Sequence, residues 1–147
     1  MTTQTFFRPA RDDQLKSGTN RAFNCGRCAT RVAIRRHSLG SLNPTIAGIN
    51  KAAGNYGSWF TGLDVSQALQ AFGVGHELHQ RNDDFEIPDL AARLKAGDYA
   101  VALVDYEQVP DSLSGDPRFD GNHFVMLNEW GQEGPLLYDP VADGRRA

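Results

Sequence analysis

NHFVMLNEWGQEGPLLYD (residues 122–139) holds two apolar runs on either side of the glycine-bounded turn GQEG (residues 131–134). Short apolar runs joined by a glycine-containing connection predict an antiparallel hairpin, with strands at residues 122–130 and 136–139. A third run, YAVALVD (residues 99–105), is continuously apolar and predicts a strand buried on both faces. The C-terminal part of the chain is therefore expected to form a small antiparallel sheet.

The N-terminal part carries the spacing of helices. The strongest helix is expected to begin at Cys25, with Asn24 as its N-cap. Its buried face should consist of Cys28, Ala29, Val32 and Ala33, which recur at helical spacing. The opposite face should be solvated and should carry Arg27, Thr30, Arg31, Arg35 and Arg36. The arginine run therefore favours a solvent-exposed helix face over a phosphate-binding patch.

Three further helices are expected, at residues 44–53, 64–72 and 88–96. Pro44 should occupy the first turn of the second helix. Asp64 should be the N-cap of the third helix, with Gln67 completing a capping box. A short strand is expected at residues 74–80 and a polar loop at residues 107–121. Because helices come first and strands last, the sequence predicts an α+β fold in which N-terminal helices pack on a C-terminal antiparallel sheet.

Length and composition restrict the class of protein. The chain has 147 residues, of which 40% are hydrophobic, and this is enough for one ordinary domain with its own core. We expect an extended N-terminal arm at residues 1–22 and a single domain at residues 23–147. The formal net charge of −3 argues against nucleic-acid binding, which normally uses a basic face. Since no apolar stretch reaches the ~20 residues that span a bilayer and no secretory signal is present, we expect a protein made in the cytoplasm without membrane contact.

Cysteine is the main functional signal, because the chain has only two cysteines, Cys25 and Cys28, spaced C-x-x-C. Two cysteines are too few for a disulfide scaffold, so a zinc site, a redox pair, inert buried thiols or a catalytic cysteine remain. Zinc normally takes four ligands, and His76-x-x-His79 is the only other pair that could supply them. A thioredoxin-like redox pair should follow a strand, and the polar arm does not supply one. We therefore expect no metal and no cofactor, and favour catalysis.

A cysteine nucleophile must be a thiolate, and a helix start and a nearby imidazolium both lower a thiol pKa. Cys25 lies at the expected start of a helix. Among the four histidines, only His123 opens an apolar strand, where its side chain would be held rigidly. Asp139 ends the partner strand, where its carboxylate can orient the imidazole. The sequence therefore indicates Cys25, His123 and Asp139 as the catalytic residues.

The same three places carry a resemblance to the bacteriocin-processing, double-glycine-leader peptidases of the papain-like clan. Phe-Asn-Cys-Gly-Arg-Cys-Ala around Cys25 is similar to their Asp-Cys-Gly-x-x-Cys-type motif, and Gly-Asn-His-Phe-Val-Met-Leu resembles their Gly-His-Phe-Val-Val segment. Leu-Tyr-Asp-Pro around Asp139 resembles their terminal Asp-Pro. The resemblance implies a papain-like fold that cleaves an amide bond in a peptide or protein through a thioester, with Cys25 as nucleophile, His123 as acid and base, and Cys28 as a packing residue.

One position departs from the pattern of that family. These peptidases place a glutamine six residues before the nucleophile, where its amide helps to bind the oxyanion, and this chain has Thr19 there. Asn20 or Gln14 could take its place beside the backbone N–H of Cys25. Losing one oxyanion donor typically costs about 10²–10³ in rate. The departure leaves open an inactive papain-like module with a structural or binding role, for instance in a phage particle with assembly partners bound through the arm.

Aromatic residues in GNYGSWFTG (residues 54–62) are candidates for a substrate groove. They are Tyr56, Trp59 and Phe60. The alternative is that they anchor an ordinary hydrophobic loop.

The triad also requires a particular strand register. His123 and Asp139 can meet only if both side chains lie on the same face of the sheet. A regular two-residue hairpin at residues 132–133 would bring Asp139 opposite Met126, on the wrong face. We therefore expect an odd loop or a bulge between residues 130 and 136, which returns Asp139 to the face of His123.

Overall fold

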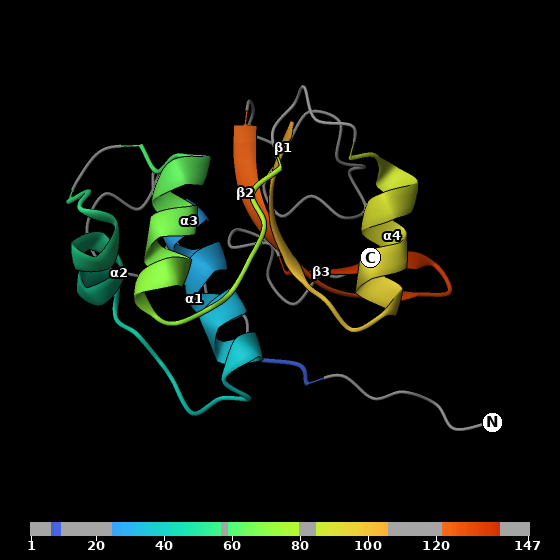
Figure 1. The fold of residues 1–147 in the computed structure, drawn as a ribbon, viewed down its shortest axis with the longest axis horizontal. Coiled ribbons are helices and arrows are strands. Elements are labelled where there is room, and N and C mark those ends of the chain that lie inside the picture. The colour runs from blue at the N-terminus through green and yellow to red at the C-terminus, as the bar shows by residue number, and fades with distance from the viewer. Residues whose placement is uncertain (1–6, 10–24, 57–58, 80–84, 106–121, 139–147) are drawn as a thin grey trace.

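The computed structural model describes residues 7–9, 25–56, 59–79, 85–105 and 122–138. Within this part of the chain there are four helices and a three-stranded antiparallel sheet, so the α+β class is confirmed (Figure 1). The helices are α1 (Cys25–His37), α2 (Ile46–Ala53), α3 (Gly62–Ala71) and α4 (Ile87–Lys95). The strands are β1 (Ala100–Asp105), β2 (Asn122–Gly131) and β3 (Gly134–Tyr138).

Some expected segments are absent or lie outside the described residues. Residues 74–79 form no strand, so the short strand expected there is wrong. Of the expected arm, only residues 7–9 are described, and the expected loop at residues 107–121 lies outside the described ranges.

The sheet lies between two helical layers. Figure 1 shows α1, α2 and α3 on one face of the sheet and α4 on the other. Alternation of side chains along β2 explains this arrangement, because Phe124 and Met126 join the cluster beneath α1, whereas Val125 and Leu127 pack with Leu94 of α4. β2 is therefore buried on both faces, which holds its side chains in place.

β1 is the strand that differs most from expectation. The order of the described strands is β1-β2-β3, so β2 is central and β1 lies at one edge. Leu103 of β1 is 53% exposed. The expectation that residues 99–105 are buried on both faces is therefore wrong, because an apolar run does not reveal a strand's place in the sheet.

β2 contains a bulge at Asn128. The hairpin turn is a regular two-residue connection (residues 132–133), but the register shifts between Leu127 and Glu129. The irregularity thus lies within the strand and not between residues 130 and 136, where we expected it. Its effect on register is the one expected, because an extra residue on one strand moves the following pairs by one position.

Residues 7–9 dock on this bulge. Asn128 is fully buried, and its Nδ2 donates to the carbonyl of Phe7 (3.0 Å). Arg8 donates two hydrogen bonds to Glu129 (2.8 and 3.0 Å). These hydrogen bonds hold the pKa of the Glu129 carboxyl below its ordinary value. The bulge is therefore held from outside the sheet by a segment near the start of the chain.

The arginine-bearing face of α1 is largely covered, contrary to expectation, and Arg31 and Arg35 are half-buried. Arg27, Thr30 and Arg36 are buried. Arg36 donates to the carbonyl of Gly97 (3.1 Å), and its guanidinium lies 4.6 Å from the centre of the Tyr99 ring. Arginine can be buried when acceptors and an aromatic face surround it, and sequence does not show where such partners come from. The expected buried face is confirmed at Cys28, Ala29, Val32 and Ala33.

Two helices begin at other residues than expected. α2 is capped by Thr45, whose side chain accepts from the N–H of Gly48, and Pro44 precedes the cap instead of lying in the first turn. α3 is capped by Thr61, and Asp64 is the third helical residue of the capping box instead of the cap. In both helices, a threonine hydroxyl satisfies a backbone N–H of the first turn.

Candidate active site

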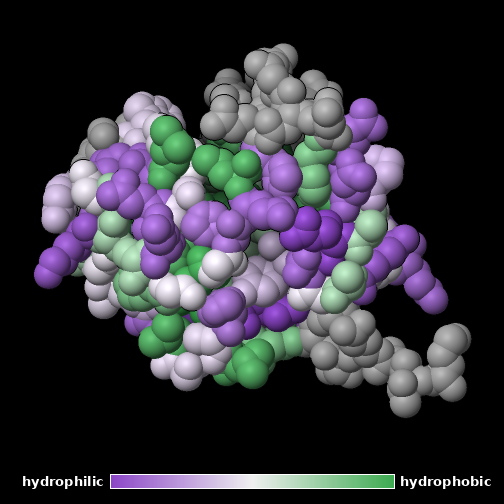
Figure 2. All heavy atoms as spheres, viewed as in Figure 1, coloured by the Kyte–Doolittle hydropathy of each residue, from purple (hydrophilic) through white to green (hydrophobic). Residues whose placement is uncertain are grey.

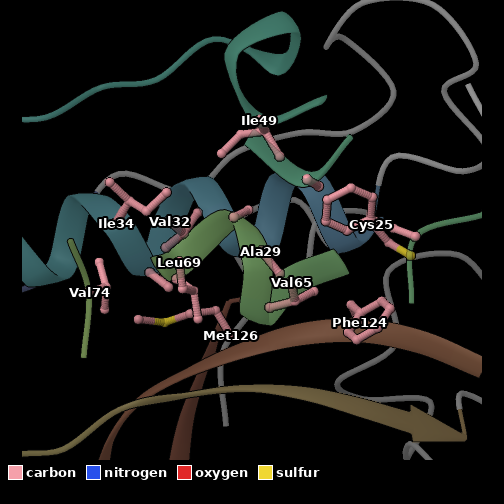
Figure 3. Packing of buried hydrophobic residues seen from close by; sticks show 14 residues of the cluster. Cys25, Ala29, Val32, Ile34, Ile49, Val65, Leu69, Val74, Phe124 and Met126 are labelled. Carbon is pink, nitrogen blue, oxygen red and sulfur yellow. The ribbon is translucent and has the colours of Figure 1, made fainter. Parts of the chain in front are cut away.

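Cys25 is the first residue of α1, at the positive end of that helix. Its side chain is 6% exposed and lies at one end of the hydrophobic cluster, beside Phe124 (Figure 3). Figure 1 shows the starts of α1, α3 and β2 at the same edge of the molecule. Elements far apart in sequence therefore begin at the same edge of the molecule as Cys25.

His123 lies near the start of β2 and is fully buried. Its side chain forms a hydrogen bond with Cys25. The structure thus brings together the expected nucleophile and its expected acid–base partner.

The charge state of Cys25 depends on opposing effects. Burial raises the pKa of the Cys25 thiol, whereas hydrogen bonds from the His123 side chain and from the backbone N–H groups of Phe124 and Gly26 lower it. Together with the charge of His123, these donors bring the pKa below the ordinary value of 9.0. Cys25 therefore carries more thiolate at neutral pH than an ordinary cysteine does.

β2 also supplies a backbone donor to Cys25. The N–H of Phe124 donates to the sulfur, and this hydrogen bond lowers the pKa of the thiol. The start of β2 therefore binds the cysteine with both a side chain and the backbone.

Gly26 allows the start of α1 to approach two aromatic rings. A Cβ atom at this position would lie 3.0 Å from Cδ2 of Phe124 and 3.0 Å from Cβ of Phe60. Phe60 is buried, whereas Tyr56 and Trp59 are exposed. Of the three groove candidates, Phe60 therefore serves as a hydrophobic anchor, and Tyr56 and Trp59 remain on the surface.

Arg27 belongs to the surroundings of the nucleophile, although sequence reasoning missed it. Its guanidinium lies 4.6 Å from the centre of the Phe60 ring. It donates hydrogen bonds to Asn50 and to Oδ1 of Asn55 (3.2 Å). Burial lowers the pKa of Arg27, and attraction to nearby acidic groups, Cys25 among them, acts in the opposite direction. The one signal in the sequence is its place between the two cysteines.

Cys28 lies one turn after Cys25 and is fully buried, and both are thiols, not a disulfide. Among the described residues, no three His, Cys, Asp or Glu side chains are grouped as a metal ion would require. His76 is hydrogen-bonded to Ser66 (2.6 Å) and to the carbonyl of Val74 (2.9 Å). Cys28 is thus a buried thiol of α1, and its role as a packing residue stays a prediction.

The remaining residues expected at the site lie outside the described ranges. They are Asp139, Asn24, Thr19, Asn20 and Gln14. The orienting, capping and oxyanion roles expected of these positions stay predictions.

In comparisons with protein-family models, curated proteins and solved structures, nothing matched this chain. None of the helices in the described ranges has the length and apolar character needed to cross a membrane. Function is therefore inferred from the geometry and chemistry of the described residues.

Proposed function

We propose that this chain is a papain-like cysteine peptidase or amidase that cleaves an amide bond through a thioester. The observation that supports this most directly is the hydrogen bond between Cys25 and His123, with the pKa of the thiol lowered despite burial. Burial alone would raise the pKa and leave little thiolate. A nucleophile at a helix start and an imidazole at a strand start form the pair that covalent cysteine catalysis needs.

In the proposed reaction, the Cys25 thiolate attacks the carbonyl carbon of the substrate. The C–N bond then breaks as the His123 imidazolium gives its proton to the leaving amine. Neutral His123 next takes a proton from water, whose oxygen attacks the thioester and releases the acid and the thiolate. Backbone N–H groups at the start of α1 are candidates for binding the oxyanion.

Asp139 is the proposed orienting residue, and the bulge in β2 supports this assignment. Tyr138 pairs with Met126 in the described ladder. One further pair in the same register would bring residue 139 opposite Val125, whose side chain shares the face of His123. Without the bulge, the same residue would lie opposite Met126, on the other face.

A second function is favoured by the burial of the pair. Cys25 and His123 are both almost inaccessible in the described part of the chain. A papain-like module that binds a partner or builds an assembly needs no access to the sulfur. Thr19, where the resembling family has its oxyanion glutamine, supports the same alternative.

Labelling with iodoacetamide separates the two functions. At a low dose near pH 6, an activated Cys25 should be alkylated well before Cys28, as peptide mass spectrometry would show. Once a peptide substrate is found, Cys25→Ala should abolish hydrolysis while the melting temperature is retained. Equal labelling of the two thiols, or hydrolysis that survives Cys25→Ala, would refute the peptidase proposal.

A further inference from the structure

We propose that Arg27 is a positioning residue for the nucleophile, a buried cation that favours negative charge on Cys25 and ties the start of α1 to the segment that carries Trp59. This inference rests on the proposed function, since it concerns the same cysteine. It assigns a role to a residue that the sequence places on a solvated face.

A network of side-chain amides surrounds the guanidinium. Arg27 donates through Nε to Asn50 and through a terminal nitrogen to both Oδ1 (3.2 Å) and the carbonyl (3.4 Å) of Asn55. Asn55 in turn donates through Nδ2 to the carbonyl of Trp59 (2.9 Å) and to Oδ2 of Asp64 (3.0 Å). A single guanidinium thus connects α1, the end of α2 and the start of α3.

The geometry requires arginine and not merely a positive charge. A guanidinium is planar and presents five donors, so it can reach several acceptors and stack on a ring at the same time. The Arg27 guanidinium stacks on Phe60, and Phe60 packs against Gly26, the neighbour of Cys25. The same side chain therefore holds the aromatic wall beside the nucleophile.

The charge of Arg27 acts in a poorly solvated place. Arg27 is 2% exposed, and its charged form is stabilised by the charge of Asp64 first and then by Cys25 and Cys28. In the proposal, the same attraction favours the thiolate of Cys25, in addition to the donors on His123, Phe124 and Gly26 that act on the sulfur directly. Unlike His123, an arginine stays charged throughout the working pH range.

The segment held by Arg27 presents apolar side chains at the edge where α1 and β2 begin. Trp59 is 64% exposed, and Leu63 in the first turn of α3 is exposed as well. In Figure 2, hydrophobic residues gather at this edge beside the start of α3. In the proposed enzyme, this surface would contact the substrate close to the scissile bond.

The pH dependence of Cys25 alkylation by iodoacetamide tests the role of the charge. Arg27→Met keeps the apolar stem and removes the cation, so the apparent pKa of alkylation should rise and the rate at pH 6 should fall several-fold. Arg36→Met is the matched control, because Arg36 is also buried in α1, stacks on an aromatic ring, and lies near the opposite end of the helix. This control should keep the wild-type pH profile even though it loses stability.

Arg27→Lys tests the positive charge separately from the planar guanidinium, and it replaces Arg27→Met if that variant does not fold. The lysine variant should keep the wild-type pH profile of alkylation but lose the hydrogen bonds to Asn55. Chymotrypsin should then cleave after the exposed Tyr56 and Trp59 several-fold faster than in the wild type, because the segment between α2 and α3 is released.

Each outcome decides between the two proposals. A wild-type profile in Arg27→Met, or an equal shift in Arg36→Met, overturns the role of the charge and leaves the peptidase proposal standing. Unchanged chymotrypsin cleavage of Arg27→Lys overturns the anchoring role. Equal labelling of Cys25 and Cys28 in the wild type overturns the peptidase proposal and this inference together.

Discussion

Gly26 offers the most direct test of packing at the proposed site, and we predict that Gly26→Ala destabilises the protein although alanine favours helices. The added Cβ would lie 3.0 Å from Cδ2 of Phe124 and 3.0 Å from Cβ of Phe60. The ring of Phe124 can rotate slightly, but Cβ of Phe60 cannot move without its backbone. Overpacking of this kind typically costs about 1–3 kcal/mol.

Helix preference acts in the opposite direction, because alanine is favoured over glycine by about 0.5–1 kcal/mol. The net expectation is a loss of about 1–2 kcal/mol, or roughly 2–8 °C in melting temperature. Gly62→Ala is the matched control, since Gly62 is the first residue of α3 and, among the described residues, its Cβ would meet only Cδ1 of Leu78, at 3.9 Å. This control should gain about 0.4–1 kcal/mol.

Urea unfolding at pH 7, followed by circular dichroism, measures both free energies. The two substitutions should change the unfolding midpoint in opposite directions with the slope unchanged. Displacement of Cys25 from His123 should also slow alkylation at pH 6 in Gly26→Ala and not in Gly62→Ala. If both variants are stabilised to the same extent, the packing argument at Gly26 is wrong.

His123→Ala should slow alkylation of Cys25 at pH 6 by about tenfold or more, because the thiolate loses its side-chain donor; an unchanged rate would contradict the assigned pair. Glu129→Gln should lower the free energy of unfolding at pH 7 by about 0.5–1 kcal/mol. Arg8 lowers the pKa of Glu129, so this difference in free energy should be fully present above the unfolded-state pKa and should disappear as the pH falls through the folded-state pKa. Paired urea titrations at pH 7 and pH 3 measure it. A difference that is the same at both pH values would exclude the ion pair as its cause. Leu103→Thr should change the free energy of unfolding by less than about 0.5 kcal/mol, because this side chain faces solvent on an edge strand; a loss of several kcal/mol would show that β1 is covered.

The fold class could be predicted because local patterns determine it. Helical spacing places Ala29 and Val32 on one face of α1, and both are buried. The glycine-bounded turn correctly predicts the hairpin of β2 and β3. Cysteine chemistry also predicts that Cys25 and His123 lie in contact, because a helix start and a nearby imidazolium both lower a thiol pKa. The hydrogen bond between the two side chains confirms this contact.

Three of the errors have a common physical cause, which is dependence on partners distant in sequence. Arg27 is buried because amides and an aromatic ring from beyond α1 surround it, and nothing in its own segment reveals them. Leu103 is exposed because strand order places β1 at the edge. The bulge lies at Asn128, where Phe7 supplies an acceptor, and not at the turn residues that favour irregular backbone.

The lowered pKa of Cys25 is a product of tertiary structure and not of the helix alone. Burial in the core raises the pKa, and the first turn of α1 contributes only one of the donors that oppose it. The others come from His123 and Phe124, so β2 must be docked on α1 for the pKa to fall below its ordinary value. In the proposed enzyme, a motion that admits substrate to the sulfur must therefore preserve the contact between α1 and β2.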